Sequence, residues 1–168
     1  MTTEKQATDP ASVGRAYFEA VARRDLEAME AFYEPGGIGE IHGLVELRAG
    51  GNYREWFGNL FRAVPDLRME IVDVLASEEK VAVRWRATGT FDGDASFEGL
   101  RPNGAHVDLQ GCDVLAIREG RIQRNDAYTN AAQLARQLGA LPPQGSTMER
   151  VSVALANLKT RIAARRGR

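Results

Sequence analysis

Apolar residues near the start of the chain recur three and four positions apart, as on one face of an α-helix. The first such stripe follows Asp9 and Pro10, which suit the N-cap and the first turn of a helix. A second, shorter stripe follows Asp25 and is ended by the Pro-Gly-Gly sequence at 35–37. The third stripe is the strongest and ends at Pro65; it contains Tyr53, Trp56, Phe57, Leu60, Phe61 and Val64. We therefore predict three helices in this part of the chain.

The pattern then changes to an alternation of apolar and polar residues, which is typical of β-strands. It predicts strands over residues 67–76, 81–91, 105–118 and 121–130. The segment 91–104 is rich in Gly and Asp, which favours a long loop. Short turns join the strands within each pair, so these neighbours must run antiparallel, and we expect the sheet to be a meander.

Helical spacing returns after the last predicted strand. Residues 131–139 predict one to two turns of helix, and a linker over 141–145 follows. Ser146 and Glu149 form a capping box for a last helix. The apolar stripe of that helix is narrow, as for a helix that lies across another helix or a partner subunit, and contains Met148, Val151, Leu155, Leu158 and Ile162.

These patterns divide the chain into four parts. Residues 1–8 predict a disordered lead, 9–140 one domain, 141–145 a linker, and 146–168 an amphipathic C-terminal helix with a basic tail. The predicted fold class is α+β, with a curved antiparallel sheet wrapped around the N-terminal helices to form a cone. Such a cone leaves an internal pocket that suits a small ligand.

Composition and charge restrict the class of protein. The 168 residues are 43% hydrophobic and 27% charged, with a formal net charge of −1, so neither nucleic acid nor a membrane surface is indicated as a partner. The single cysteine, Cys112, excludes an intrachain disulfide, and no Cys/His spacing indicates a zinc site. The polar N-terminus does not resemble a signal peptide, and no apolar run is long enough to span a bilayer. We expect a cytoplasmic protein.

Three segments carry a family resemblance: AYFEAVARRDLEAMEAFY at 16–33, FRAVPDLRMEIVDVLASEEKVAVRWRATGTFDG at 61–93, and RIQRNDAYTNAAQLARQLG at 121–139. Together they resemble the SnoaL-like polyketide cyclases of the nuclear-transport-factor-two-like superfamily, which also contains limonene epoxide hydrolase. The resemblance covers residues 11–140 and implies a cone-shaped fold, a homodimer formed through the outer sheet face, and no cofactor. It further implies ring closure by intramolecular aldol condensation, with one carboxylate in the pocket as general acid/base.

The chain departs from the family at that carboxylate. The resemblance places it nine residues before the glycine of the QLG motif, and this position is Asn130. An amide cannot take a proton from carbon, so the reaction cannot use position 130 in this way. Asp126 stands four residues earlier on the same strand face, because side chains alternate with period two. We therefore predict Asp126 as the general acid/base, with His42, which also matches the family, as a proton partner.

Arg124, Asp126, Tyr128 and Asn130 share one face by this alternation, and the resemblance implies that the face looks into the pocket. Tyr128 and Asn130 are then candidate ligand-binding residues that donate hydrogen bonds to a substrate oxygen. Plainer roles stay open: an ion pair between Asp126 and an arginine, an ordinary half-buried aromatic at Tyr128, and a helix N-cap at Asn130. His42 has a structural alternative as well.

Arg84 and Trp85 alternate on a central predicted strand, so only one of them faces the pocket. We favour arginines on the outer face and Trp85 in the pocket, and keep Arg84 as a candidate ligand-binding residue. Trp56 and Phe91 complete the expected ligand contacts, with core packing as the alternative role for Trp56. We expect no metal site.

Three hypotheses follow for the function. The first is a cofactor-independent, polyketide cyclase-like enzyme that acts on a small apolar or polycyclic carbonyl compound through Asp126. The second, suggested by the same superfamily, is an epoxide hydrolase in which Asp126 activates water and Arg84 holds it. The third is a homodimeric module that binds a small ligand without catalysis, since the expected acid is missing at Asn130.

Overall fold

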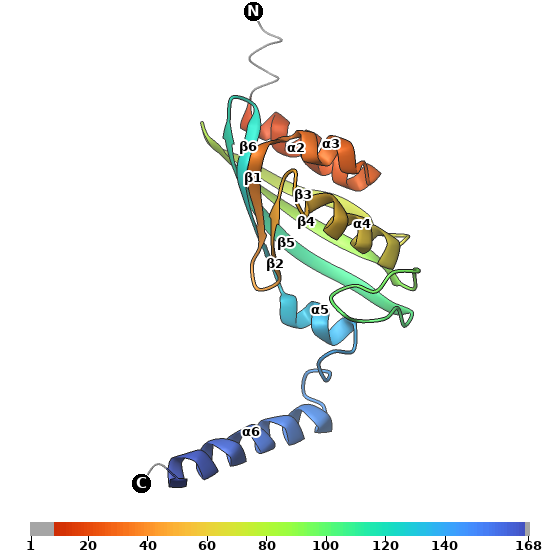
Figure 1. Ribbon diagram of the computed structural model, residues 1–168, viewed down its shortest axis with the longest axis vertical. Coiled ribbons are helices and arrows are strands. Elements are labelled where there is room, and N and C mark those ends of the chain that lie inside the picture. The colour runs from red at the N-terminus through yellow and green to blue at the C-terminus, as the bar shows by residue number, and fades with distance from the viewer. Residues whose placement is uncertain (1–8, 167–168) are drawn as a thin grey trace, which may run out of the picture.

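The computed structural model describes residues 9–166, and their helices and strands form one sheet with helices packed against it (Figure 1). The helices are α2 (Pro10–Arg23), α3 (Leu26–Ala31), α4 (Tyr53–Ala63), α5 (Ala131–Gln137) and α6 (Thr147–Arg166). The strands are β1 (Tyr33–Ile41), β2 (Val45–Arg48), β3 (Arg68–Ala76), β4 (Lys80–Phe91), β5 (Ala105–Arg118) and β6 (Arg121–Thr129). The expected disordered lead at 1–8 and the end of the basic tail at 167–168 lie outside the described residues.

The six strands are ordered β2-β1-β6-β5-β4-β3. Neighbouring strands run antiparallel except β1 and β6, which pair in parallel. The sheet is curved and open, and α2, α3 and α4 cover one of its faces, so the predicted α+β fold is confirmed (Figure 1). The sequence pattern did not predict the β1–β2 hairpin or the parallel pair, because the glycine-rich segment 35–43 shows no regular alternation.

Helix α2 begins and packs as its sequence predicts. The Ser12 backbone N–H donates to Asp9 Oδ2 at 3.1 Å and satisfies one of the free donors of the first turn. The helix lies close to the sheet, since a Cβ atom at Gly14 would come within 2.9 Å of Val81 Cγ1. The stripes of α2 and α4 build the core together with the sheet, through Val13, Tyr17, Phe18, Val21, Tyr53 and Phe61.

Helix α6 extends away from the other elements (Figure 1). Ser146 caps its start as predicted, because the Glu149 N–H donates to Ser146 Oγ at 3.1 Å. The reciprocal bond of the predicted capping box is not formed, since the Glu149 carboxylate accepts from the Gly145 N–H and the Ser146 N–H donates to the Pro143 carbonyl oxygen. Arg136 Nη2 of α5 donates to Glu149 Oε1 at 3.1 Å. The predicted apolar stripe is exposed at Met148, Val151, Leu155, Leu158 and Ile162. None of the helices within residues 9–166 combines the length and the apolar character that crossing a membrane requires.

Candidate active site

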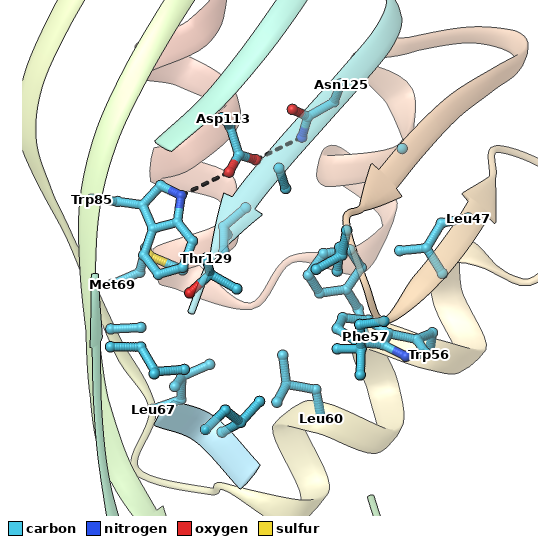
Figure 2. Close-up of a pocket in the computed structure, with 18 of the residues that line it drawn as sticks. Leu47, Trp56, Phe57, Leu60, Leu67, Met69, Trp85, Asp113, Asn125 and Thr129 are labelled. Atoms are coloured by element: carbon cyan, nitrogen blue, oxygen red, sulfur yellow. Dashed lines mark hydrogen bonds between the residues drawn. The ribbon is translucent and has the colours of Figure 1, made fainter. Parts of the chain in front are cut away.

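The helices and the inner sheet face line a partly open cavity of about 140 Å³ (Figure 2). Its walls are almost entirely apolar, and their aromatic side chains include Phe18, Trp56, Phe57, Trp85 and Phe91. Three of these, Trp56, Trp85 and Phe91, are residues for which the sequence predicts ligand contact. The structure places them on the cavity wall, and their contact with a ligand stays a prediction.

Asp113 of β5 brings a carboxyl group to this wall, with only 6% of the residue exposed. Trp85 Nε1 donates to Asp113 Oδ1 at 2.7 Å, and Asn125 Nδ2 donates to Asp113 Oδ2 at 2.7 Å (Figure 2). Burial disfavours the charged carboxylate more than these two donors favour it, so the pKa of Asp113 lies above its ordinary value. A carboxyl group with a raised pKa is suited to proton transfer near neutral pH.

Three tyrosine side chains line the same cavity. The hydroxyl oxygens of Tyr17 and Tyr53 lie 2.8 Å apart, and Tyr33 donates to the Tyr17 hydroxyl at 3.5 Å. Burial raises the pKa of each hydroxyl, that of Tyr33 to about 12, and the nearby charge of Asp113 raises all three pKa values further. The three hydroxyls therefore keep their protons at neutral pH and act as hydrogen-bond donors.

The predicted acid, Asp126, lies on the opposite face of the sheet. The pairing register between β5 and β6 shifts at Gln123, where β6 has one extra residue. Ile122 is buried before this bulge, whereas Asn125 and Ala127 are buried after it. The extra residue reverses the alternation of side chains along β6. The prediction that the polar face of this strand looks into the pocket is therefore wrong.

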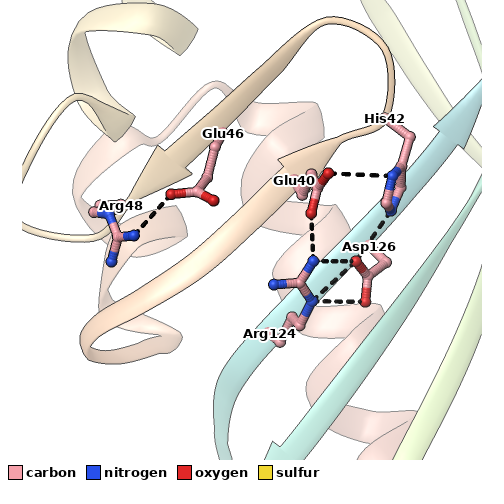
Figure 3. Close-up of polar contacts among 6 residues, drawn as sticks. All are labelled: Glu40, His42, Glu46, Arg48, Arg124 and Asp126. Carbon is pink, nitrogen blue, oxygen red and sulfur yellow. Dashed lines mark hydrogen bonds and ion pairs between the residues drawn. The ribbon is translucent and has the colours of Figure 1, made fainter.

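On the outer face, Asp126 belongs to a network of ion pairs (Figure 3). Arg124 Nε donates to both Asp126 carboxylate oxygens at 3.0 Å, and Arg124 also pairs with Glu40. His42 Nε2 lies 3.1 Å from Asp126 Oδ1, and the His42 ring stacks on Tyr128 with centroids 4.4 Å apart. Hydrogen bonds from Arg124 hold the pKa of Asp126 below its ordinary value. Asp126 and His42 are thus neighbours, but they do not line the cavity.

Glu40, His42 and Asp126 also have ligand atoms within 4.8 Å of one another, as a metal site requires. However, Glu40 Oε1 lies 3.3 Å from His42 Nδ1, whereas Asp126 contacts the other ring nitrogen. The two carboxylates therefore flank opposite sides of the imidazole, and Arg124 already bonds to both (Figure 3). This arrangement fits an ion-pair network better than a metal site.

The remaining predicted ligand-binding residues, Arg84, Tyr128 and Asn130, line an open groove on the outer face. Asn130 Oδ1 accepts from the Gln133 N–H at 2.9 Å, so the alternative role of Asn130 as an N-cap is confirmed. Strand β5 separates Arg84 on β4 from Asp126 on β6. The Arg84–Asp126 pair of the epoxide hydrolase hypothesis therefore does not form.

The family model described as SnoaL-like polyketide cyclase matches residues 11–138. The chain belongs to the SnoaL-like polyketide cyclase family. No curated protein gave a significant match.

Solved structures share the SnoaL-like fold at low sequence identity. AclR from Streptomyces galilaeus, a proposed hydroxylase, is 23% identical with a TM-score of 0.69, and the match covers 90% of this chain and 94% of AclR. A proposed SnoaL-like polyketide cyclase from Jannaschia sp. CCS1 is 19% identical with a TM-score of 0.70 over 84% of this chain and 97% of that one. An LEH-like epoxide hydrolase from M. tuberculosis is 16% identical, with a TM-score of 0.60, and the match covers 80% of this chain and 90% of that one.

Asp113 is not among the site residues predicted from the sequence, although the pattern along β5 contains a signal for it. Alternate positions of β5 are apolar and buried at Val107, Leu109, Leu115 and Ile117. Asp113 lies on the same side of β5 by this alternation. It is the one charged residue on that side of the strand. A carboxylate in the apolar phase of a central strand must be buried, and burial shifts its pKa.

Proposed function

We propose that this SnoaL-like protein is an acid/base enzyme that moves a proton next to a carbonyl group of a small, largely apolar compound. The observation that carries the proposal is Asp113, a buried carboxyl group with a raised pKa on the wall of an apolar cavity. Family membership supports a cyclase-type reaction. An aldol ring closure requires such a proton transfer, because the attacking carbon must first become an enolate.

In the proposed reaction, the Asp113 carboxylate accepts a proton from the carbon beside the carbonyl group. The electron pair of that C–H bond moves into the enolate, and its negative charge develops on the carbonyl oxygen. A hydroxyl of the tyrosine cluster formed by Tyr17, Tyr33 and Tyr53 donates a hydrogen bond to this oxygen. The enolate carbon attacks a second carbonyl group of the same molecule, and the proton on Asp113 passes to the new alkoxide. The ring is then closed and Asp113 is again a carboxylate.

The surroundings of Asp113 support both of its protonation states. The apolar walls favour the neutral acid, whereas the donors Trp85 and Asn125 stabilise the carboxylate. Because the raised pKa makes Asp113 a stronger base than an exposed aspartate, Asp113 is suited to accept a proton from carbon.

Deuterium exchange tests the proton transfer without the natural substrate. Cyclohexanone is incubated with the protein in D2O, and NMR follows the loss of its protons next to the carbonyl group. We expect exchange above the buffer rate with the wild type, and a rate about 10²–10⁴-fold lower with Asp113→Asn. Asp126→Asn makes the same substitution on the outer face and should leave the rate close to that of the wild type. Equal rates in the wild type and Asp113→Asn, or no exchange by the wild type, would contradict the proposal.

A second candidate function is ligand binding without catalysis, which the apolar walls of the cavity favour. In that case a one-ring ligand would raise the melting temperature of both the wild type and Asp113→Asn, and cyclohexanone would exchange at the buffer rate in both.

We also propose a homodimer through the outer sheet face, where Val72 and Tyr128 are exposed. Sedimentation analysis of Val72→Lys against the wild type tests this assembly.

A further inference from the structure

Helix α6 has an apolar stripe that stays exposed within residues 9–166. We call this stripe the α6 seam, and its members are between 45% and 70% exposed: Met148, Val151, Leu155, Leu158 and Ile162. The helix extends away from the sheet and the other helices, so the body of its own chain does not cover the seam (Figure 1). A free helix gains little stability in water, because most helices depend on the packing of an apolar face. The α6 seam therefore indicates a binding surface for a partner.

The spacing of the α6 seam identifies the kind of partner. Its members follow one another at intervals of three, four, three and four residues, which is the heptad spacing of a coiled coil. The positions beside the seam are small or polar, as at Ser152, Ala154 and Lys159. Helix α4, which packs against the sheet, instead has a wider stripe with adjacent apolar residues such as Trp56 and Phe57. A narrow seam fits one other helix better than it fits a sheet or a lipid surface.

A second copy of the chain supplies a helix that matches. Within residues 9–166, α2 and α4 already bury their apolar stripes in the core, and α3 and α5 have only 6 and 7 residues. The α6 seam of a second copy is exposed and has the same spacing. Two copies of one surface can match each other about a two-fold axis, as in most homodimers.

The distribution of charge along α6 decides the orientation of such a pair. By sequence, residues 159–166 contain four basic residues and no acidic one, whereas residues 147–158 contain one of each. A parallel pair would place the two basic ends side by side, and like charges repel. An antiparallel pair separates the two basic ends and brings each one near the end of the other helix that contains Glu149.

We propose that α6 pairs antiparallel with α6 of a second copy of this chain, through the α6 seam. The pair goes beyond the proposed dimer through the outer sheet face, because it uses a different surface. That surface lies outside residues 11–138, which match the family model, so family membership does not account for it. The outer sheet face and the α6 seam are then two separate association surfaces.

Cross-linking of the full-length chain tests the pair and its orientation together. Cys112→Ser removes the one native thiol, and Met148→Cys or Ile162→Cys places a thiol at one end of the seam. These ends lie about 21 Å apart along the helix. A mixture of the two variants is treated with a bismaleimide linker shorter than this distance, and mass spectrometry identifies the joined peptides. We expect links mainly between position 148 of one copy and position 162 of the other. Links mainly between like positions, or no links, would overturn the inference.

Sedimentation analysis provides an independent test in chains that carry Val72→Lys, so that the outer sheet face does not contribute. The Val72→Lys chain should still form a dimer. Adding Leu155→Lys should halve the measured mass, because it places a charge without a partner in the seam. Asn157→Lys adds the same charge at an exposed position outside the seam and should leave the mass unchanged. Equal masses for the two double variants, or a Val72→Lys chain that is already monomeric, would contradict the inference.

The same variants separate this inference from the proposed function. Neither Leu155 nor Asn157 lines the cavity, so cyclohexanone exchange should keep its rate in both. A chain that pairs through α6 without Asp113-dependent exchange contradicts the proposed function alone. A chain that shows this exchange but does not pair contradicts the inference alone.

Discussion

Asp113 and Asp126 lie on neighbouring strands, where Asp113 pairs with Ala127 and Val114 pairs with Asp126, yet they point to opposite faces of the sheet. On the inner face, burial among apolar walls raises the pKa of Asp113. On the outer face, hydrogen bonds from Arg124 lower the pKa of Asp126. One residue type thus provides a buried carboxyl group with a raised pKa on one face and a charged ion-pair partner on the other. The surroundings, rather than the residue type, decide the chemistry.

Among the substitutions that test the difference between the two faces, the largest effect is expected at Gly111. This glycine leaves room for the indole of Trp85 on the inner face. A Cβ atom at position 111 would lie 2.3 Å from Trp85 Cζ2. Gly111→Ala should displace the indole and lower the free energy of unfolding by about 1–3 kcal/mol, as overpacking does. It should also slow cyclohexanone exchange, because Trp85 no longer positions Asp113. Urea unfolding and the exchange rate measure the two effects.

Gly58→Ala is the matched control for that substitution. A Cβ atom at Gly58 would meet Leu26 Cδ1 at an ordinary 3.7 Å, and Gly58 lies within α4. Alanine favours the helix, so the free energy of unfolding should rise by about 0.5–1 kcal/mol. The same loss of stability in both variants would show that close packing against Trp85 is not the cause.

A smaller effect is expected from Trp85→Phe, which keeps the aromatic wall but removes the donor to Asp113. That donor favours the charged carboxylate, so its loss raises the pKa of Asp113 further. The acid limb of the pH–rate profile for exchange should move to higher pH, with about a tenfold lower rate on that limb. Trp56→Phe is the control, because Trp56 Nε1 donates to Glu98 at 2.8 Å. A limb that moves in both variants, or in neither, would count against the role of Trp85.

The smallest effect is expected on the outer face. Asp126→Asn should lower the free energy of unfolding at pH 7 by about 0.5–1 kcal/mol, as for a partly exposed ion pair. The folded-state pKa of Asp126 is depressed, so its stabilisation is complete above the unfolded value of about 3.9 and is lost as the pH falls through the folded value. The difference between wild type and variant should shrink in acid. Urea unfolding at several pH values measures it, and a difference that grows in acid would contradict the ion pair.

The sequence predicts those parts of the fold in which apolar and polar residues alternate or recur regularly. Asp9 caps its helix as expected, and the alternation along β4 correctly places Trp85 inside and Arg84 outside. In β6, one extra residue at Gln123 reverses the alternation, and no glycine or proline marks the bulge. The parallel pairing of β1 with β6 joins segments that are far apart in the sequence, so local patterns cannot predict it. The hydrogen bonds from Trp85 and Asn125 to Asp113 result from three-dimensional packing, so no sequence pattern predicts them.

Titration of the two aspartates is the most direct test of the contrast between the faces. The carboxyl carbons are followed by 13C NMR across the acidic and neutral range, and Asp113→Asn and Asp126→Asn assign the two signals. We predict that Asp113 titrates above the ordinary value of about 3.9 and Asp126 below it. An Asp113 signal that titrates at or below this value would contradict the assignment of Asp113 as the proton-transfer group of the cavity.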